Sequence, residues 1–382
     1  MHTATAGTRV PLKFWLDPAT YEPQALEQAQ ALSALPFAVK HIVVLPDSHV
    51  GYGMPIGCVL ATDGTVVPNA VGVDISCGVQ AEKLSCEGID QETVKRIMGR
   101  IRETIPLGFN HHQDEQPWDG FAEAPDLPVI RAELSSAKRQ LGTLGGGNHF
   151  IEIQTGDDGH VWLMLHSGSR NFGLKIAKYY HEAAVRLCES FYSEVPKDLS
   201  FLPHSSPLWQ EYMDAMQFAC RFAHASRNAM MDRMVEACYL ETASVEVYRV
   251  DVNHNYAAME HHFGKNVLVH RKGAIRSQEG EVGIIPGSMG SASYITRGLG
   301  NPDSFCSSSH GAGRAMGRTQ AKERLSLETE QAKMEGIVHG LRNQGDLDEA
   351  PGAYKDIDEV MDNQADLTKI EVTLRPIGSI KG

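Results

Sequence analysis

The sequence lacks the features that define membrane, secreted and repeat proteins. It contains no uninterrupted apolar run near the ~18 residues that a membrane span needs, and its first twenty residues show no basic segment followed by an apolar one. We therefore expect a cytoplasmic protein without membrane attachment. It also has no fixed-period repeat, low-complexity tract or Pro/Ser linker, so no domain boundary is marked.

Paired cysteines are absent as well. The seven cysteines form an odd and scattered set without a CxxC pair, which argues against a disulfide framework and against a zinc ribbon. We expect reduced thiols that mostly pack as small buried side chains. A functional cysteine must therefore be identified from its neighbours.

An excess of basic residues is missing too, since the formal charge is −13. Sequence-independent binding of nucleic acid normally uses a basic surface. A nucleic-acid substrate would need local attraction, from bound divalent cations and clustered arginines inside an acidic shell. On charge alone, an acidic enzyme with a small-molecule substrate is an equal alternative.

The patterning predicts an α+β fold, a single large domain over residues 1–382 with a β-sheet core and covering helices. Its 42% hydrophobic content can fill a sizeable core. Apolar residues recur every three or four positions over 175–192, 209–239 and 318–342, which predicts helices. Short β-branched runs predict strands over 41–45, 161–165, 245–250 and 267–270. Residues 344–351 have the composition of a connecting loop, and the strand-like end, 374–382, is expected to fray.

Asp47 and His49 precede a run of glycines in PDSHVGYG. Positions two apart in an extended segment face the same side, so this carboxylate and this imidazole can act together. A capped turn with a satisfied surface histidine is the alternative.

Five further residues form a candidate metal-ligand set. Asp74 and Cys77 end an apolar, strand-like stretch and can converge on one cation. His149, His166 and His254 each end an apolar run beside small polar residues that can fix a tautomer. Together they suffice for a dinuclear site with a bridging thiolate. The donors favour zinc, with manganese or iron second, while ordinary packing of the cysteine and histidines is the alternative.

His310 lies in the most unusual segment, residues 283–314, which is rich in serine and glycine and ends with Arg314. Small residues let backbone N–H groups approach phosphate oxygens, and the arginine adds a charged donor. His310 is therefore a candidate acceptor of a phosphoryl or nucleotidyl group. A glycine-rich turn with a helix cap is the alternative.

Taken together, the segments PDSHVGYG, AVGVDISCG, LGGGNHFIE, MLHSGSRNFG, VNHNY, IIPGSMG, SSSHGAGR and IGSIKG resemble the RtcB family of RNA ligases, in the same order and over nearly the full length. The resemblance implies joining of RNA 3′-phosphate or 2′,3′-cyclic phosphate ends to 5′-hydroxyl ends, in RNA repair or tRNA splicing. It also implies GTP and two Mn²⁺ ions as cofactors, and an archease-like activator is a candidate partner.

The resemblance also assigns roles to single positions. Asp74, Cys77, His149, His166 and His254 match the metal ligands, with Cys77 shared, and His310 matches the guanylylated histidine. The positions that match the GTP-binding residues are Asn148, His149, Phe150, Glu152, Asn255, Pro286, Gly287, Ser288, Met289, Ser293, His310, Gly311, Ala312, Gly313, Tyr354 and Lys381. Our own hypothesis for the RNA-contacting positive surface is Arg170, Arg271, Lys272, Arg297 and Arg314.

Departures from the family pattern stand at Ser76, Gly146, Asn171, Phe172 and Asn253. None removes a ligand or the nucleophile, so they indicate a divergent, bacterial paralogue whose RNA substrate is open. Two alternatives to ligation are a dinuclear metal phosphodiesterase that opens cyclic phosphates and a non-catalytic RNA-binding factor.

Overall fold

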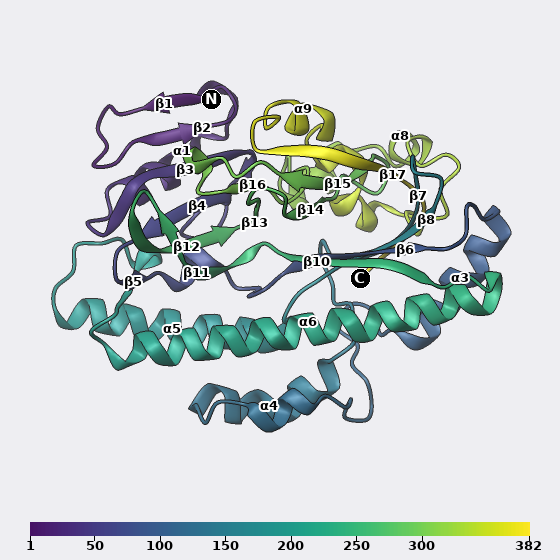
Figure 1. Cartoon of the computed structure of the whole chain (residues 1–382), viewed down its shortest axis with the longest axis horizontal. Coiled ribbons are helices and arrows are strands. Elements are labelled where there is room, and N and C mark those ends of the chain that lie inside the picture. The colour runs from purple at the N-terminus through teal and green to yellow at the C-terminus, as the bar shows by residue number, and fades with distance from the viewer.

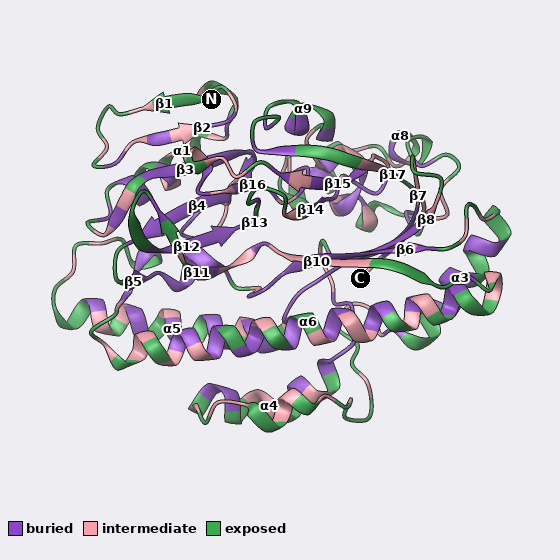
Figure 2. Cartoon of the chain, in the orientation of Figure 1, coloured by how far each residue is buried: buried purple, intermediate pink, exposed green.

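The computed structural model describes residues 1–382 and confirms an α+β architecture. Two large β-sheets lie side by side, and two long helices run beneath them along the length of the molecule (Figure 1). The strands are mostly buried, whereas the long helices alternate buried and exposed residues (Figure 2). No helix is long and apolar enough to span a membrane.

The sheets are mainly antiparallel, with only β2 and β3 parallel. The six-stranded sheet has the order β1 (His2–Ala4), β2 (Leu12–Phe14), β3 (Ala38–His49), β4 (Ile56–Thr62), β12 (Lys265–Lys272) and β11 (Asn255–His262). The seven-stranded sheet has the order β10 (Glu246–Asn253), β6 (Gly78–Leu84), β8 (Val161–Ser167), β7 (Phe150–Gly156), β17 (Thr368–Lys381), β15 (Ser293–Gly298) and β14 (Val282–Ile285). Two short pairs are β13 (Ala274–Arg276) with β16 (Ser307–Ser309), and β5 (Thr65–Val66) with β9 (Leu202–Pro203).

The helices include two that the periodicity predicts, α5 (Arg170–Ser190) and α6 (Pro207–Thr242). Ser206 caps α6 by accepting the N–H of Leu208, and Ala243 ends it in the left-handed region. The others are α1 (Pro23–Ser33), α2 (Pro68–Val71), α3 (Gln91–Thr104), α4 (Pro128–Gln140), α7 (Arg318–Arg324), α8 (Leu327–Ala332) and α9 (Ile357–Asp362). The three predicted stretches therefore miss several helices, among them α3, which buries Val94, Ile97 and Ile101 at helical spacing.

The single helix predicted over 318–342 is also wrong. The chain forms α7 and α8, separated at Leu325 and Ser326, whose backbones are extended. The segment then leaves the helix after Ala332, and Gly336 has a φ of +83°. Only Ala321 in α7 and Glu330 in α8 are buried. Because so few residues pack against the rest of the protein, nothing stabilises a longer amphipathic helix here.

The C-terminal stretch does not fray. Residues 374–381 of β17 pair with β7, where Lys381 is opposite Phe150, while residues 368–374 pair with β15. On the other edge of the C-terminal half, Val338 exchanges backbone hydrogen bonds with Ile377 and Ser379. These bonds satisfy the backbone and fix the position of its side chains. The loop expected at 344–351 contains a 3₁₀ turn, η5 (Gln344–Glu349), closed by a capping box on Asn343.

Candidate active site

Four adjacent strands bring the candidate metal ligands together. Cys77 directly precedes β6 and His149 directly precedes β7, while His166 in β8 is opposite Phe150. His254 lies between β10 and β11, where the chain passes from one sheet to the other. Because β10, β6, β8 and β7 are neighbours, these side chains meet at one end of the seven-stranded sheet.

The ligand atoms form two groups of three that share the thiol of Cys77. Sγ of Cys77 lies 3.4 Å from Nε2 of His149 and 3.2 Å from Nε2 of His166. Oδ2 of Asp74 lies 3.1 Å from Nε2 of His149. Nε2 of His166 lies 3.3 Å from Nε2 of His254. Two cations that share the sulfur would fit this arrangement.

The surroundings of the ligands fit bound cations. The Nδ1–H groups of His149 and His166 donate to the carbonyls of Leu144 (3.0 Å) and Asn148 (3.1 Å), so each Nε2 lone pair faces the cluster. Burial holds the pKa of His166 far below its usual value, which keeps the imidazole neutral. Burial, with the Asp74 charge, raises the pKa of Cys77 well above its usual value, so a thiolate there needs a cation. This donor set therefore fits a metal pair.

His310 follows β16 and is oriented by a buried carboxylate. Oδ2 of Asp47, on β3, accepts the Nδ1–H of His310 (2.6 Å) and its backbone N–H (3.2 Å). In the neutral ring this hydrogen bond selects the tautomer that has the lone pair on Nε2, where it can act as a nucleophile. Gly313 permits the close approach, because a Cβ there would lie 2.1 Å from the Asp47 carbonyl oxygen. The ring of His310 lies 4.7 Å from that of His254, so the nucleophile adjoins the metal-capable cluster.

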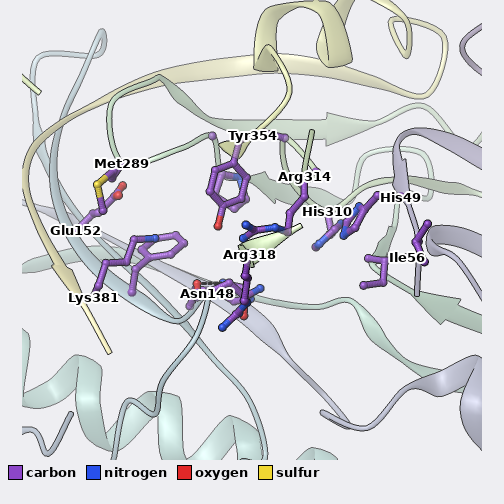
Figure 3. Close-up of a pocket in the computed structure, with 18 residues that line it drawn as sticks. His49, Ile56, Asn148, Glu152, Met289, His310, Arg314, Arg318, Tyr354 and Lys381 are labelled. Atoms are coloured by element: carbon purple, nitrogen blue, oxygen red, sulfur yellow. Dashed lines mark hydrogen bonds between the residues drawn. The ribbon is translucent and has the colours of Figure 1, made fainter. Parts of the chain in front are cut away.

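A cavity of about 310 Å³ extends away from His310. His310 and His49 lie at one end, Glu152 and Lys381 lie at the other, and Arg318 lies between them (Figure 3). We call it the nucleotide cavity. The predicted GTP-binding residues that line it are Asn148, Phe150, Glu152, Pro286, Gly287, Met289, His310, Gly311, Ala312, Gly313, Tyr354 and Lys381.

The far end of the nucleotide cavity carries a buried carboxylate. Glu152 accepts hydrogen bonds from Gln154 (2.8 Å) and Ser379 (3.3 Å). Burial raises its pKa to about 7, although the nearby Lys381 opposes the shift. Nζ of Lys381 lies 5.0 Å from the ring centre of Phe150. This end can recognise a flat, polar group that offers donors to a carboxylate.

Four predicted nucleotide-binding residues do not line this cavity. Ser293 and Ser288 brace its wall, since Ser293 Oγ accepts the N–H of Gly287 (3.1 Å) and Ser288 contacts Ser291 (2.9 Å). Asn255 donates to the Asp74 carbonyl (3.0 Å). His149 faces a second cavity. These side chains hold the cavity wall or the metal-capable cluster.

Only two of the five residues predicted to form a positive surface line a cavity at the site. Arg271 is fully buried and pairs with Glu260, and Lys272 is 6% exposed with its Nζ bound to the carbonyls of Tyr52 and Asn69. Their prediction as RNA-contacting residues is wrong, because neither reaches the surface. Arg297 is exposed, pairs with Glu371, and lines neither cavity.

Arg314 and Arg170 do reach the two cavities. Arg314 lines the nucleotide cavity, stacks on Tyr354 and pairs with Glu349 at 3.1 Å. Arg170 lines the second cavity.

Sequence reasoning missed two contributors to the site. The segment of Asp47 and His49 stood out as chemically unusual, but the role of Asp47 in orienting His310 appears only in the fold. Arg318 lines the nucleotide cavity and pairs with Glu349 at 3.2 Å. Arg318 lies in a segment predicted as a covering helix, and no pattern there indicated a role at the site.

Three departures from the family pattern now have a structural setting. Ser76 has a φ of +55°, a conformation that glycine adopts at lower cost. Gly146 and Asn171 line the second cavity.

Comparison with known proteins agrees with this geometry. A family model described as "tRNA-splicing ligase RtcB" matches residues 28–127 and 119–382. The "RNA-splicing ligase RtcB" of Escherichia coli K12 is 37% identical, with 97% of each chain covered. The protein of the same name from Mycobacterium tuberculosis is 32% identical over 93% of this chain and 100% of its own. The "tRNA-splicing ligase RtcB" of Nanoarchaeum equitans is 33% identical over 94% of this chain and 92% of its own. With His310 and the cysteine–histidine cluster meeting at one cavity, and with matches of this extent, the chain belongs to the RtcB family.

Proposed function

We propose that this chain is an RNA ligase that joins 3′-phosphate or 2′,3′-cyclic phosphate ends to 5′-hydroxyl ends through a guanylylated His310. The observation that carries the proposal is the hydrogen bond of 2.6 Å between Nδ1 of His310 and Asp47. It presents the unprotonated Nε2 beside both a metal-capable cluster and a cavity of nucleotide size. Residues 1–382 would act as one catalytic domain.

GTP would occupy the nucleotide cavity with its base at the Glu152 end. The N1–H and exocyclic amine of guanine are donors that match a carboxylate, whereas adenine offers an unprotonated N1 there. Tyr354, Arg314 and Arg318 lie along the middle of the cavity (Figure 3). Their rings and cations suit the sugar and phosphates, which places the α-phosphorus toward His310.

Asp74, Cys77, His149, His166 and His254 would hold two Mn²⁺ ions. When bound, the ions supply positive charge that offsets the developing charge on phosphate oxygens. The thiolate and imidazoles favour zinc, and only the carboxylate of Asp74 is a typical manganese ligand, so the choice of Mn²⁺ rests on the family. The protein's own part is to keep the imidazoles neutral and their Nε2 atoms facing the cluster.

The reaction would proceed in three main steps. Nε2 of His310 attacks the α-phosphorus of GTP, forming an N–P bond as the bond to pyrophosphate breaks. An oxygen of the RNA 3′-phosphate then attacks the same phosphorus, releasing His310 and giving RNA capped with guanylate. The 5′-hydroxyl loses its proton and attacks the RNA phosphorus, and GMP leaves. A cyclic phosphate must first be opened by water. Activation by an archease-like protein stays a prediction.

The test is covalent labelling of the purified protein with α-³²P-GTP and MnCl₂. We expect acid-labile label on the wild-type protein and none on His310→Ala. His204→Ala is the matched control, because His204 packs against Trp209, lies outside the nucleotide cavity and should leave labelling intact. No label on the metal-loaded wild type would overturn the proposal in favour of a phosphodiesterase or an RNA-binding factor.

A further inference from the structure

The second cavity, of about 540 Å³, opens on the Asp74 and His149 side of the metal-capable cluster. The nucleotide cavity opens on His166 and His310, and the two cavities share Asn148 and Arg318. A space of this size accommodates a nucleotide. Any group bound in the second cavity would therefore meet the guanylate across the cluster.

The second cavity contains a cation that is not consumed by a direct ion pair. Arg170 feels the charge of the nearby Asp74 but makes no salt bridge to it, and its Nε has no hydrogen-bond partner. Its Nη1 lies 3.1 Å from Nδ1 of His149, but the proton of that atom already goes to the Leu144 carbonyl. Arg170 and Asn171 also begin α5, whose free backbone N–H groups add positive potential. The cavity is thus suited to a phosphate.

Phe109 lies at the rim of the second cavity and is 98% exposed. It is in a turn in which Asn110 donates its backbone N–H to the carbonyl of Leu107 (3.2 Å). Gly108, with a φ of +63°, donates in turn to the carbonyl of Gly145 (3.1 Å). The backbone of the turn is fixed, yet its aromatic ring has no intramolecular packing.

The same backbone segment supports both the turn and the metal-capable cluster. Leu144 donates its N–H to the carbonyl of Pro106 (3.0 Å), at the start of the turn. The carbonyl of Leu144 accepts the Nδ1–H of His149 (3.0 Å). The backbone that carries Phe109 is therefore held at a set position relative to His149.

We propose that the second cavity receives the 3′ end of a single-stranded RNA, with its last base stacked on Phe109 and its terminal phosphate at Arg170. The inference rests on the ligase function proposed above and names the site of one substrate strand. Stacking on an aromatic ring is how proteins hold unpaired bases without reading sequence. A terminal phosphate, with its extra negative charge, matches the unpaired guanidinium.

The surroundings of Phe109 favour a nucleic acid over a protein partner. A stable protein interface covers about 800 Å² on each partner and has an apolar centre. The residues that follow Phe109 in the chain, Asn110 and His111, are polar and exposed. A single ring beside an unpaired cation is enough for one stacked nucleotide, but it is not enough for a protein surface.

The test uses Phe109→Ala and the stacking-competent Phe109→Tyr in the full-length, Mn²⁺-loaded protein. Tyr192→Ala is the matched control, because Tyr192 is 91% exposed but lies beyond the far end of α5, about 30 Å away. We expect all three variants to be labelled by α-³²P-GTP like the wild type. Phe109→Ala should raise the KM for a 3′-phosphorylated RNA roughly ten-fold, the usual size of a lost base stack. Phe109→Tyr and Tyr192→Ala should not.

A second substrate isolates the stacking contact. With an RNA whose last nucleotide is abasic, wild type and Phe109→Ala should have the same raised KM. An unchanged KM for Phe109→Ala on the intact RNA overturns the proposal, as does an equal penalty on the abasic RNA. A defect that appears only when cell extract is added would assign Phe109 to a protein partner and also overturn it. Failure of GTP labelling in the wild type would instead overturn the ligase function.

Discussion

Nδ1 of His310 lies 2.6 Å from Oδ2 of Asp47, although 263 positions separate the two residues in the chain. Asp47 is fully buried, and the same oxygen also accepts the backbone N–H of His310. The ring can therefore adopt one tautomer and one orientation. The relationship makes Asp47 a positioning residue for the nucleophile.

Asp47→Ala should slow guanylylation of His310 by on the order of 10²–10⁴-fold, because the ring loses its fixed tautomer. Asp47→Asn should recover part of the rate, since an amide oxygen can still accept the Nδ1–H. Single-turnover labelling with α-³²P-GTP measures both. Bound metal should stay at the wild-type level in each variant, and an unaltered labelling rate in Asp47→Ala would refute the role.

Cys77→Ala should reduce binding at both metal positions, because the sulfur belongs to both ligand groups. Elemental analysis after loading with MnCl₂ and desalting measures the metal per chain. Cys86→Ala is the matched control, since Cys86 is a partly buried thiol that packs against the hydrophobic core around Leu84 and Val161, away from the ligand groups. Equal metal content in the two variants would rule out a shared thiolate.

The affinity for GTP should fall as the pH drops below about 7. Burial raises the pKa of Glu152 to about 7, and only the charged carboxylate accepts both guanine donors. The Kd for GTP, measured by calorimetry between pH 6 and 8, should therefore rise toward the acidic end. In Glu152→Gln the affinity should be weaker and independent of pH over this range, and a wild-type pH profile in that variant would contradict the assignment.

The raised pKa of Glu152 also predicts how the free energy of unfolding of the nucleotide-free protein changes with pH. A carboxyl whose folded pKa is raised from 4.5 to about 7 stabilises the fold below pH 4.5, and that contribution is lost as the pH rises through 7. Glu152→Gln should thus be more stable than the wild type at pH 8, by roughly 1–3 kcal/mol. Urea unfolding at pH 5 and pH 8 measures the effect, which should vanish at the lower pH.

Arg271→Ala should lower the free energy of unfolding by about 3–5 kcal/mol, because it leaves the buried Glu260 without the guanidinium and with only His262 beside it. Arg297→Ala is the comparison, since its exposed pair with Glu371 contributes about 0–1 kcal/mol. Urea unfolding measures both. If Arg271→Ala unfolded like the wild type but bound RNA weakly, the placement of Arg271 in the core would be contradicted.

The candidate ligands and the candidate nucleophile could be predicted from the sequence alone. The donor types at Asp74, Cys77 and His254 indicate a mixed soft and hard ligand set, and the glycine-rich segment around His310 predicts contact with phosphate. These signals are local, because each depends on a residue and its immediate neighbours. Strands such as β8 and the helices α5 and α6 were predictable for the same reason, since side-chain periodicity is also local.

Which of the candidate side chains lie close together follows from the tertiary structure and could not be predicted from the sequence. The pairing of β6, β7, β8 and β10 gathers ligands that lie far apart in the chain, and burial turned Arg271 into a core residue. The C-terminal half of β17 is ordered because β7 pairs with one of its edges and Val338 binds the other. Asp47 reached His310 through contacts between distant strands. Such contacts depend on packing over the whole chain, and no short window of sequence contains them.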